Sequence, residues 1–190
     1  MNRRQMMLSA LAAGGLGTAS AVQGQTLSQS NYRIPRHLMP RQIEVDESFV
    51  PGTIYAYNEQ RMLYWITEPG RAIRYAIAIG AEGREFRGTA HVARKAEWPS
   101  WRPTATMVRL EPAVYGPYRS GLPGGHPRNP LGARALYLYR GGRDTLYRIH
   151  GTPQPWTLGR SFSSGCLRLA NEHIEDLYDR VPVGTPVVVV

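Results

Sequence analysis

One cysteine and one histidine could do chemistry together in this chain. Cys166 is its only cysteine and lies in the run 163–168, Ser-Ser-Gly-Cys-Leu-Arg. His150 opens the upstream run 150–152, His-Gly-Thr. A thiol nucleophile needs a base that supplies thiolate at neutral pH, and it needs donors for the oxyanion that forms on attack. The pattern predicts an acyl-transfer site with Cys166 as nucleophile and His150 as general base and acid.

The residues around this pair are candidates for holding substrate. The amides of Gly165 and Cys166 are candidates for the oxyanion hole, because a residue without a side chain lets substrate approach closely. Arg168 either binds a substrate carboxylate or is a structural ion-pair partner. Trp156 lies between the two runs and is expected to line the donor site. Further substrate-binding candidates are Gly151, Ser163, whose hydroxyl is expected mainly to shape its loop, and Ser164.

The first 21 residues predict export. Arg3 and Arg4 form a basic start, Met6 to Leu16 form a short apolar stretch, and 19–21, Ala-Ser-Ala, fits a small-x-small cleavage site. This signal peptide is too short for a stable membrane span. The paired arginines resemble a twin-arginine signal, and an ordinary Sec signal is the alternative. We expect no transmembrane segment in the mature form.

Export bears on how the lone cysteine is interpreted. An exported chain with one cysteine cannot form an internal disulfide, so its thiol is either a reactive group, an intermolecular partner, or a buried small hydrophobe. The Ser-Ser-Gly run before Cys166 and the His-Gly-Thr run favour the reactive group.

Composition limits the partners. The formal net charge is +9, and Lys95 is the only lysine among the basic residues. The arginines are scattered and no nucleic-acid motif is visible, so anionic cell-envelope polymers are the expected partners and nucleic acid is not. No Cys/His cluster has metal-ligand spacing, so neither a metal nor another cofactor is expected. We expect a monomer, and we expect His173 at the surface.

The elements that must position the pair are mainly β-strands. The segment 53–79 reads as a β-meander, and 145–149 as the strand that delivers His150. Residues 112–131 are rich in Gly and Pro and predict a lid or substrate-binding loop. Near the end, Asn171 is the expected N-cap of a short helix that Pro182 terminates. One or two short helices are expected in all, within a β-sandwich or meander.

These residues together resemble the L,D-transpeptidase (YkuD) catalytic domain family. The resemblance is carried by the His-Gly-Thr run, its spacing to the Ser-x-Gly-Cys-x-Arg run, Asn171 and the closing stretch 183–187. The resemblance covers about residues 51–190, which it implies are the catalytic domain. The signal peptide at 1–21 precedes it, and the polar, proline-containing stretch 22–50 predicts an extended N-terminal arm. Many members carry His where this chain has Ser164, a departure that leaves the nucleophile assignment intact.

The resemblance implies a periplasmic cysteine acyltransferase that acts on peptidoglycan stem peptides. Cys166 would attack the L-centre carbonyl of a tetrapeptide, release D-alanine and form a thioester, which an acceptor amine resolves into a cell-wall crosslink. A backbone carbonyl, as the family implies, would orient His150, since no Asp or Glu lies between it and Cys166. The alternatives are an L,D-carboxypeptidase, in which water resolves the thioester, and a non-catalytic wall-binding module.

Overall fold

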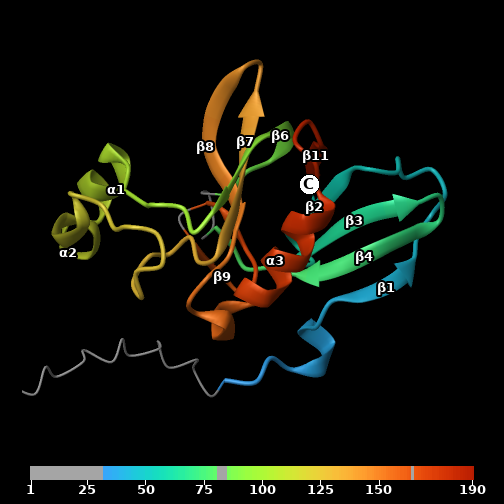
Figure 1. The fold of residues 1–190 in the computed structure, drawn as a ribbon, viewed down its shortest axis with the longest axis horizontal. Helices are drawn as coiled ribbons and strands as arrows, with labels where there is room; N and C mark the ends of the chain where they lie inside the picture. The colour runs from blue at the N-terminus through green and yellow to red at the C-terminus, as the bar shows by residue number, and fades with distance from the viewer. Residues whose placement is uncertain (1–31, 81–84, 164) are drawn as a thin grey trace, which may run out of the picture.

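The computed structural model describes residues 32–80, 85–163 and 165–190, and strands predominate in this part of the chain (Figure 1). One sheet has the strand order β1-β4-β3-β2-β11-β6-β7-β8-β10, and β5 and β9 form a second, small sheet. The mainly β fold expected from the sequence is confirmed. The described residues also form three α-helices, of which α3 is the longest.

The first half of the large sheet is an antiparallel meander, as predicted. Burial alternates along β2, where Ile54 and Ala56 face the core, because successive side chains of a strand point to opposite faces. β2 pairs with β3, and β3 with β4. Within the segment expected as an extended arm, β1 pairs with β4 and so becomes the sheet edge. The bounds are β1 (Arg41–Glu44), β2 (Ile54–Tyr57), β3 (Met62–Glu68) and β4 (Arg71–Ala76), preceded by the 3-10 turn η1 (Arg36–Leu38).

The second half of the sheet carries the candidate residues. β11 joins the halves, since it pairs in parallel with β2 and antiparallel with β6. β6, β7 and β8 are antiparallel neighbours, and β10 lies parallel to the end of β8. The bounds are β5 (Ile79–Gly80), β6 (Gly88–Glu97), β7 (Arg134–Arg140), β8 (Arg143–His150), β9 (Ser161–Ser163), β10 (Leu167–Arg168) and β11 (Pro186–Val189).

Helix α3 (Asn171–Arg180) packs on the core with Ile174 and Leu177, which are fully buried. Both belong to one cluster with Tyr75 from the meander and Ile149 from β8, so a single core joins the two halves of the sheet. Lys95, the only lysine, donates to the carbonyl oxygens of Tyr178 and Val181 at distances of 2.5 and 2.8 Å. It therefore satisfies carbonyls that the helix end leaves open.

Two expectations for this helix were wrong. The residue at the N-cap is Ala170, and Asn171 instead opens the helix and turns its side chain toward Ala133, whose amide it accepts at 3.0 Å. His173 is buried, because the first turn of the helix faces the interior.

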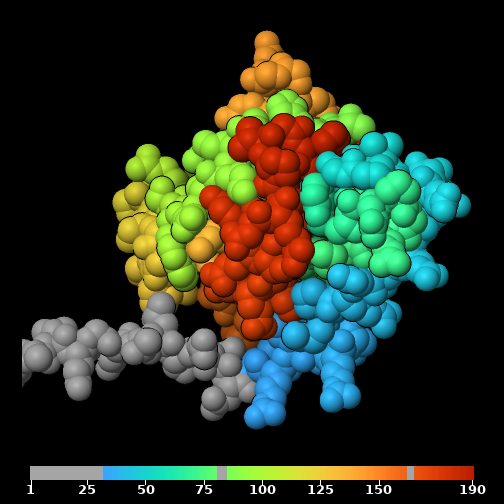
Figure 2. Space-filling model, turned by 45° about the vertical axis from the view of Figure 1, so that its right-hand side comes forward, coloured from blue at the N-terminus to red at the C-terminus, as the bar shows by residue number. Residues whose placement is uncertain are grey.

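The segment between β6 and β7 forms a lobe beside the sheet (Figures 1 and 2). It contains α1 (Ala105–Leu110). Within the loop expected over 112–131 it also contains α2 (Pro112–Tyr115) and the 3-10 turn η2 (Gly116–Tyr118). Trp101 packs against the rings of Tyr115 and Tyr118 at centroid distances of 6.3 and 6.2 Å. The buried side chain of Asn129 donates to the carbonyl oxygens of Pro99 and Pro123 and ties the ends of the lobe together.

The described residues contain no helix that is long and apolar enough to cross a membrane. The signal peptide expected at 1–21 lies outside the described residues, as does much of the expected arm.

Candidate active site

His150 is the last residue of β8, and only 2% of it is exposed. Its Nδ1 lies 2.6 Å from the carbonyl oxygen of Gly151, so an Nδ1–H donates there and Nε2 keeps its lone pair. Burial, followed by the charge of Arg168, lowers the pKa of His150 to about 3, against the opposing effect of the Gly151 bond. At neutral pH the imidazole is therefore neutral and has the form of a general base.

Strand pairing places Cys166 on the same face of the sheet as His150. β10 pairs in parallel with residues 149–150 of β8, so Arg168 lies beside His150. If the same register is extended two residues toward the N-terminus, Cys166 lies beside Arg148. Paired neighbours point to the same face, and so do residues two apart on one strand. The thiol, the imidazole and two guanidinium groups therefore gather on one face of the sheet edge.

The Cys166 thiol is protonated at rest. Its Sγ lies 3.9 Å from the carbonyl oxygen of Leu146. Burial raises the pKa of the thiol, while a main-chain hydrogen bond from Arg148 and the charges of Arg148 and Arg168 act in the opposite direction. A neutral thiol with a neutral imidazole is not a preformed ion pair. The chemistry open to this arrangement is transfer of the thiol proton as the sulfur attacks.

The residues before the cysteine form a tight approach to it. Gly165 is buried and has a φ of 130°, a conformation that side chains strongly disfavour. Ser163 ends β9 and pairs with Gly80 of β5. Ser164 lies outside the described residues. The oxyanion-hole role of the Gly165 amide thus remains a prediction from sequence, with a backbone at that position that only glycine readily adopts.

Arg168 belongs to β10, at the edge of the sheet beside His150. Burial lowers the pKa of its guanidinium, and the nearby Tyr115 of α2 opposes this effect. Its Nε is buried and has no hydrogen-bond partner among the described residues. A cation held in this way could bind an incoming carboxylate, which is the first of the two alternatives that the sequence left open.

The space around residue 151 admits only glycine without a shift of its neighbours. A Cβ built on it would lie 2.4 Å from Oδ1 of Asn171 and 3.0 Å from the amide nitrogen of Ala133. The Asn171 side chain thus holds the chain beside His150 at the point where the Gly151 carbonyl must accept the imidazole N–H. The sequence analysis read Asn171 as a helix cap and missed this positioning role, which depends on a contact between residues 38 positions apart.

Trp156 lies in the 3-10 turn η3 (Pro155–Thr157) of the loop that links His150 to Cys166. It is 40% exposed, and its ring meets that of Tyr32 edge to face at a centroid distance of 6.3 Å. The indole is therefore accessible, and it contacts a residue of the expected N-terminal arm.

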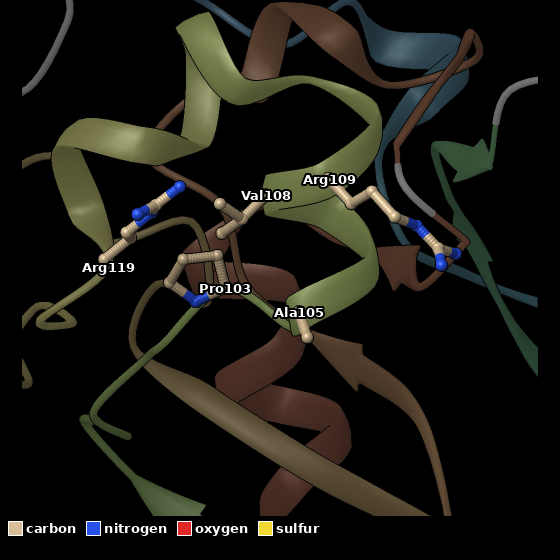
Figure 3. A pocket seen from close by; sticks show the side chains of 5 residues that line it. All are labelled: Pro103, Ala105, Val108, Arg109 and Arg119. Carbon is tan, nitrogen blue, oxygen red and sulfur yellow. The ribbon is translucent and has the colours of Figure 1, made fainter.

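A separate hollow of about 420 Å³ lies on the lobe and is lined by Pro103, Ala105, Val108, Arg109 and Arg119 (Figure 3). None of the candidate residues lines it. Within the described ranges, no group of three or more His, Cys, Asp or Glu residues is placed to hold a metal ion.

Comparison with known proteins identifies the family of the chain. Residues 40–189 match the model of the YkuD family, the L,D-transpeptidase catalytic domain. The probable L,D-transpeptidase YbiS of Escherichia coli is 36% identical over 151 residues, which cover 78% of this chain and 47% of that protein. The chain spans about half the length of the first curated relatives it matches.

Two solved structures share the fold. A structure from Brucella melitensis, named as a probable carnitine operon oxidoreductase caia, has 47% identity and a TM-score of 0.57 over 85% of this chain and 99% of that one. An L,D-transpeptidase from Mycobacterium smegmatis has a TM-score of 0.54 at 18% identity over 73% of this chain and 58% of that one, a likeness of fold alone. With the family model matched over most of the chain, the protein belongs to the L,D-transpeptidase catalytic domain family.

Proposed function

We propose that this protein is a peptidoglycan L,D-transpeptidase with Cys166 as its nucleophile. The observation that carries the proposal is the orientation of His150, whose Nδ1 is held by the Gly151 carbonyl at 2.6 Å on the sheet face that also carries Cys166. A base that is buried, neutral and fixed in one tautomer fits the activation of a thiol at the moment of attack.

The proposed reaction has two halves. In the first, Nε2 of His150 takes the thiol proton while Sγ bonds to the L-centre carbonyl carbon of a tetrapeptide stem. The amides of Gly165 and Cys166 receive the oxyanion, and collapse of the intermediate breaks the C–N bond as the imidazolium returns its proton to the leaving D-alanine. In the second, an acceptor amine gives up a proton to His150, attacks the thioester and releases the thiol with a crosslink formed.

The surrounding candidates receive substrate roles in this proposal. Arg168, half buried with an unpartnered Nε, binds a carboxylate of the stem peptide. In this proposal Trp156, whose indole is exposed, lines the donor peptide, and Gly151, Ser163 and Ser164 keep the substrate-binding role expected from the sequence. The names of the curated relatives support a peptide-crosslinking reaction, and the signal peptide expected at 1–21 supports a periplasmic location.

The test is mass spectrometry of the products formed from purified disaccharide-tetrapeptides by the wild-type protein and by Cys166→Ala. A crosslinked dimer with released D-alanine, absent with the variant, supports the transpeptidase. A tripeptide without dimer makes the protein an L,D-carboxypeptidase. Equal product from Cys166→Ala removes Cys166 as nucleophile, and no turnover by either protein favours the wall-binding module.

A further inference from the structure

β8 departs from regular pairing just before it reaches His150. Tyr139 of β7 pairs with Asp144 of β8, and Tyr137 pairs with Arg148. Between these two pairs β8 therefore contains two more residues than β7. The extra residues form a bulge. Leu146 within it has a φ of 64° and is 61% exposed, an unfavourable conformation and environment for leucine. Other interactions must therefore stabilise the bulge in this conformation.

An ion pair closes the bulge. Both oxygens of the Asp144 carboxylate accept from the Arg148 guanidinium, at 2.6 Å from Nη1 and 2.7 Å from Nη2, and Oδ1 also accepts the Leu146 amide at 2.8 Å. The guanidinium carbon lies 4.3 Å from the centroid of the Tyr137 ring. The Arg148 side chain is 13% exposed and that of Asp144 is 31% exposed, so the pair is partly shielded, and its two parallel hydrogen bonds hold one geometry.

The bulge meets the thiol through its main chain. The Leu146 carbonyl oxygen lies 3.9 Å from Sγ of Cys166, and the Arg148 main chain donates a hydrogen bond to the same sulfur. The charges of Asp144 and Arg148 also act on the pKa of the thiol, in opposite directions. The Arg148 charge favours the thiolate and the Asp144 charge disfavours it.

We propose that Asp144 and Arg148 are positioning residues that set the reactivity of Cys166, by fixing the bulge against the sulfur and by balancing their two charges beside it. The proposal rests on the proposed function only in taking Cys166 as the reacting group. The pair tunes the thiol finely, because the carboxylate offsets much of the guanidinium field, whereas Arg168 acts on the thiol from β10, two residues further along the chain.

The charged and titratable groups that act on this thiol come from several elements. β8 contributes Asp144 and Arg148, and β10 contributes Arg168. The neutral imidazole of His150 lies beside Arg168 and carries no charge to act on the thiol. Two further groups act indirectly: Arg94 of β6 on Asp144 and Tyr115 of α2 on Arg168.

Because the Asp144 and Arg148 charges shift the thiol in opposite directions, removing each one in turn gives a decisive test. Cys166 is the only thiol, so intact-protein mass spectrometry gives its rate of alkylation by iodoacetamide, and the pH midpoint of that rate reports the thiolate. Arg148→Gln should move the midpoint to higher pH, with several-fold slower alkylation at neutral pH. Asp144→Asn should move it to lower pH, with several-fold faster alkylation. Arg148→Lys keeps the charge and should restore a midpoint close to that of wild type.

The control is Arg71→Gln, which breaks an exposed ion pair with Glu68 on the far half of the sheet and should leave the midpoint unchanged. Shifts in the same direction for Arg148→Gln and Asp144→Asn, or no shift in either, overturn the proposal and leave the pair a purely structural clamp. If thermal melts show that Arg148→Gln does not fold, Asp144→Asn decides alone, and a midpoint at or above that of wild type overturns the proposal. Alkylation needs no turnover, so failure of the transpeptidase assay leaves this test intact.

Discussion

The sheet edge and the lobe beside it are built in opposite ways. At the edge, His150 is buried, Gly151 is packed against Asn171, and the Asp144–Arg148 pair fixes the strand next to the thiol. In the lobe, α1 and α2 bury no residue fully, and Leu110 and Val114 are 58% and 53% exposed. The candidate residues therefore lie in or directly beside paired strands, with His150 ending β8 and Cys166 preceding β10, whereas the lobe keeps apolar surface in contact with solvent.

This difference assigns different work to the two regions. Precise placement of a base and a nucleophile needs neighbours that lock each rotamer, which the sheet edge supplies. Exposed apolar side chains on short helices suit contact with a bound molecule, since their burial becomes favourable only when something covers them. Substitutions at the edge should change the chemical step or the fold, and those in the lobe should change substrate affinity.

The largest effect is expected from removing either reacting group. Cys166→Ala and His150→Gln should each lower the rate of D-alanine release by about 10³-fold or more, because nucleophile and base act as one unit. The double variant should be no slower than the single ones by more than a few-fold. Release of D-alanine from tetrapeptide, followed by coupled assay, measures all three, and additive losses would contradict the joint action of the two groups.

Adding one methyl group should lower the free energy of unfolding at the sheet edge but not in the lobe. Gly151→Ala places a Cβ 2.4 Å from Oδ1 of Asn171 and should cost about 1–3 kcal/mol of unfolding free energy. Gly116→Ala, at the start of η2, meets nothing within 4 Å and has a φ of −54°, so it should be neutral or stabilise by up to about 1 kcal/mol. Urea titrations give both values. Equal losses would mean that the edge is no more tightly packed than the lobe.

Acid should weaken the sheet edge through His150. Its pKa is 6.5 as a free side chain and about 3 in the fold, so between these values the unfolded chain binds the extra proton. Stability therefore rises with pH in this window and is lost as pH falls from 6.5 toward 3. His150→Gln should flatten the change in melting temperature between about pH 7 and pH 4. An identical pH dependence in wild type and variant would show that the imidazole is not held neutral.

The smallest effect on stability is expected from the lobe surface. Val114→Ser on α2 should change the unfolding free energy by less than about 0.5 kcal/mol, since the side chain is already in water. If the lobe contacts substrate, the same variant raises KM for tetrapeptide and leaves kcat near its wild-type value. Steady-state kinetics separate the two terms, and a fall in kcat at constant KM would place the lobe in the chemistry instead.

Several elements of the fold and the two candidate reacting residues were predictable from short runs of sequence. Strand-like runs separated by turn residues were enough to predict the opening meander. The His-Gly-Thr and Ser-x-Gly-Cys runs selected His150 and Cys166 as candidates, and their roles stay predictions. The helix at 171–180 was also predictable, since Ile174 and Leu177 recur at helical spacing. In each case the signal lies within a few adjacent residues.

The features that were missed depend on contacts between distant segments. The burial of His173 follows from how α3 docks on the sheet, and the role of Asn171 follows from its bond to Ala133. The bulge before His150 is visible only once β7 fixes the register of β8. Asp144 and Arg148 lie four residues apart, a spacing typical of a solvent-exposed helical pair, so nothing local indicated a partly buried ion pair within a strand.

The most direct measurement is to trap the acyl-enzyme. Wild-type protein is mixed with a tetrapeptide stem, without added acceptor amine, and quenched in acid for intact-mass and peptide-level mass spectrometry. The predicted result is a mass increase equal to the acyl tripeptide, located on Cys166, slowed in His150→Gln and absent in Cys166→Ala. Acylation of another residue, or the same adduct in Cys166→Ala, would contradict the assignment of Cys166 as the nucleophile.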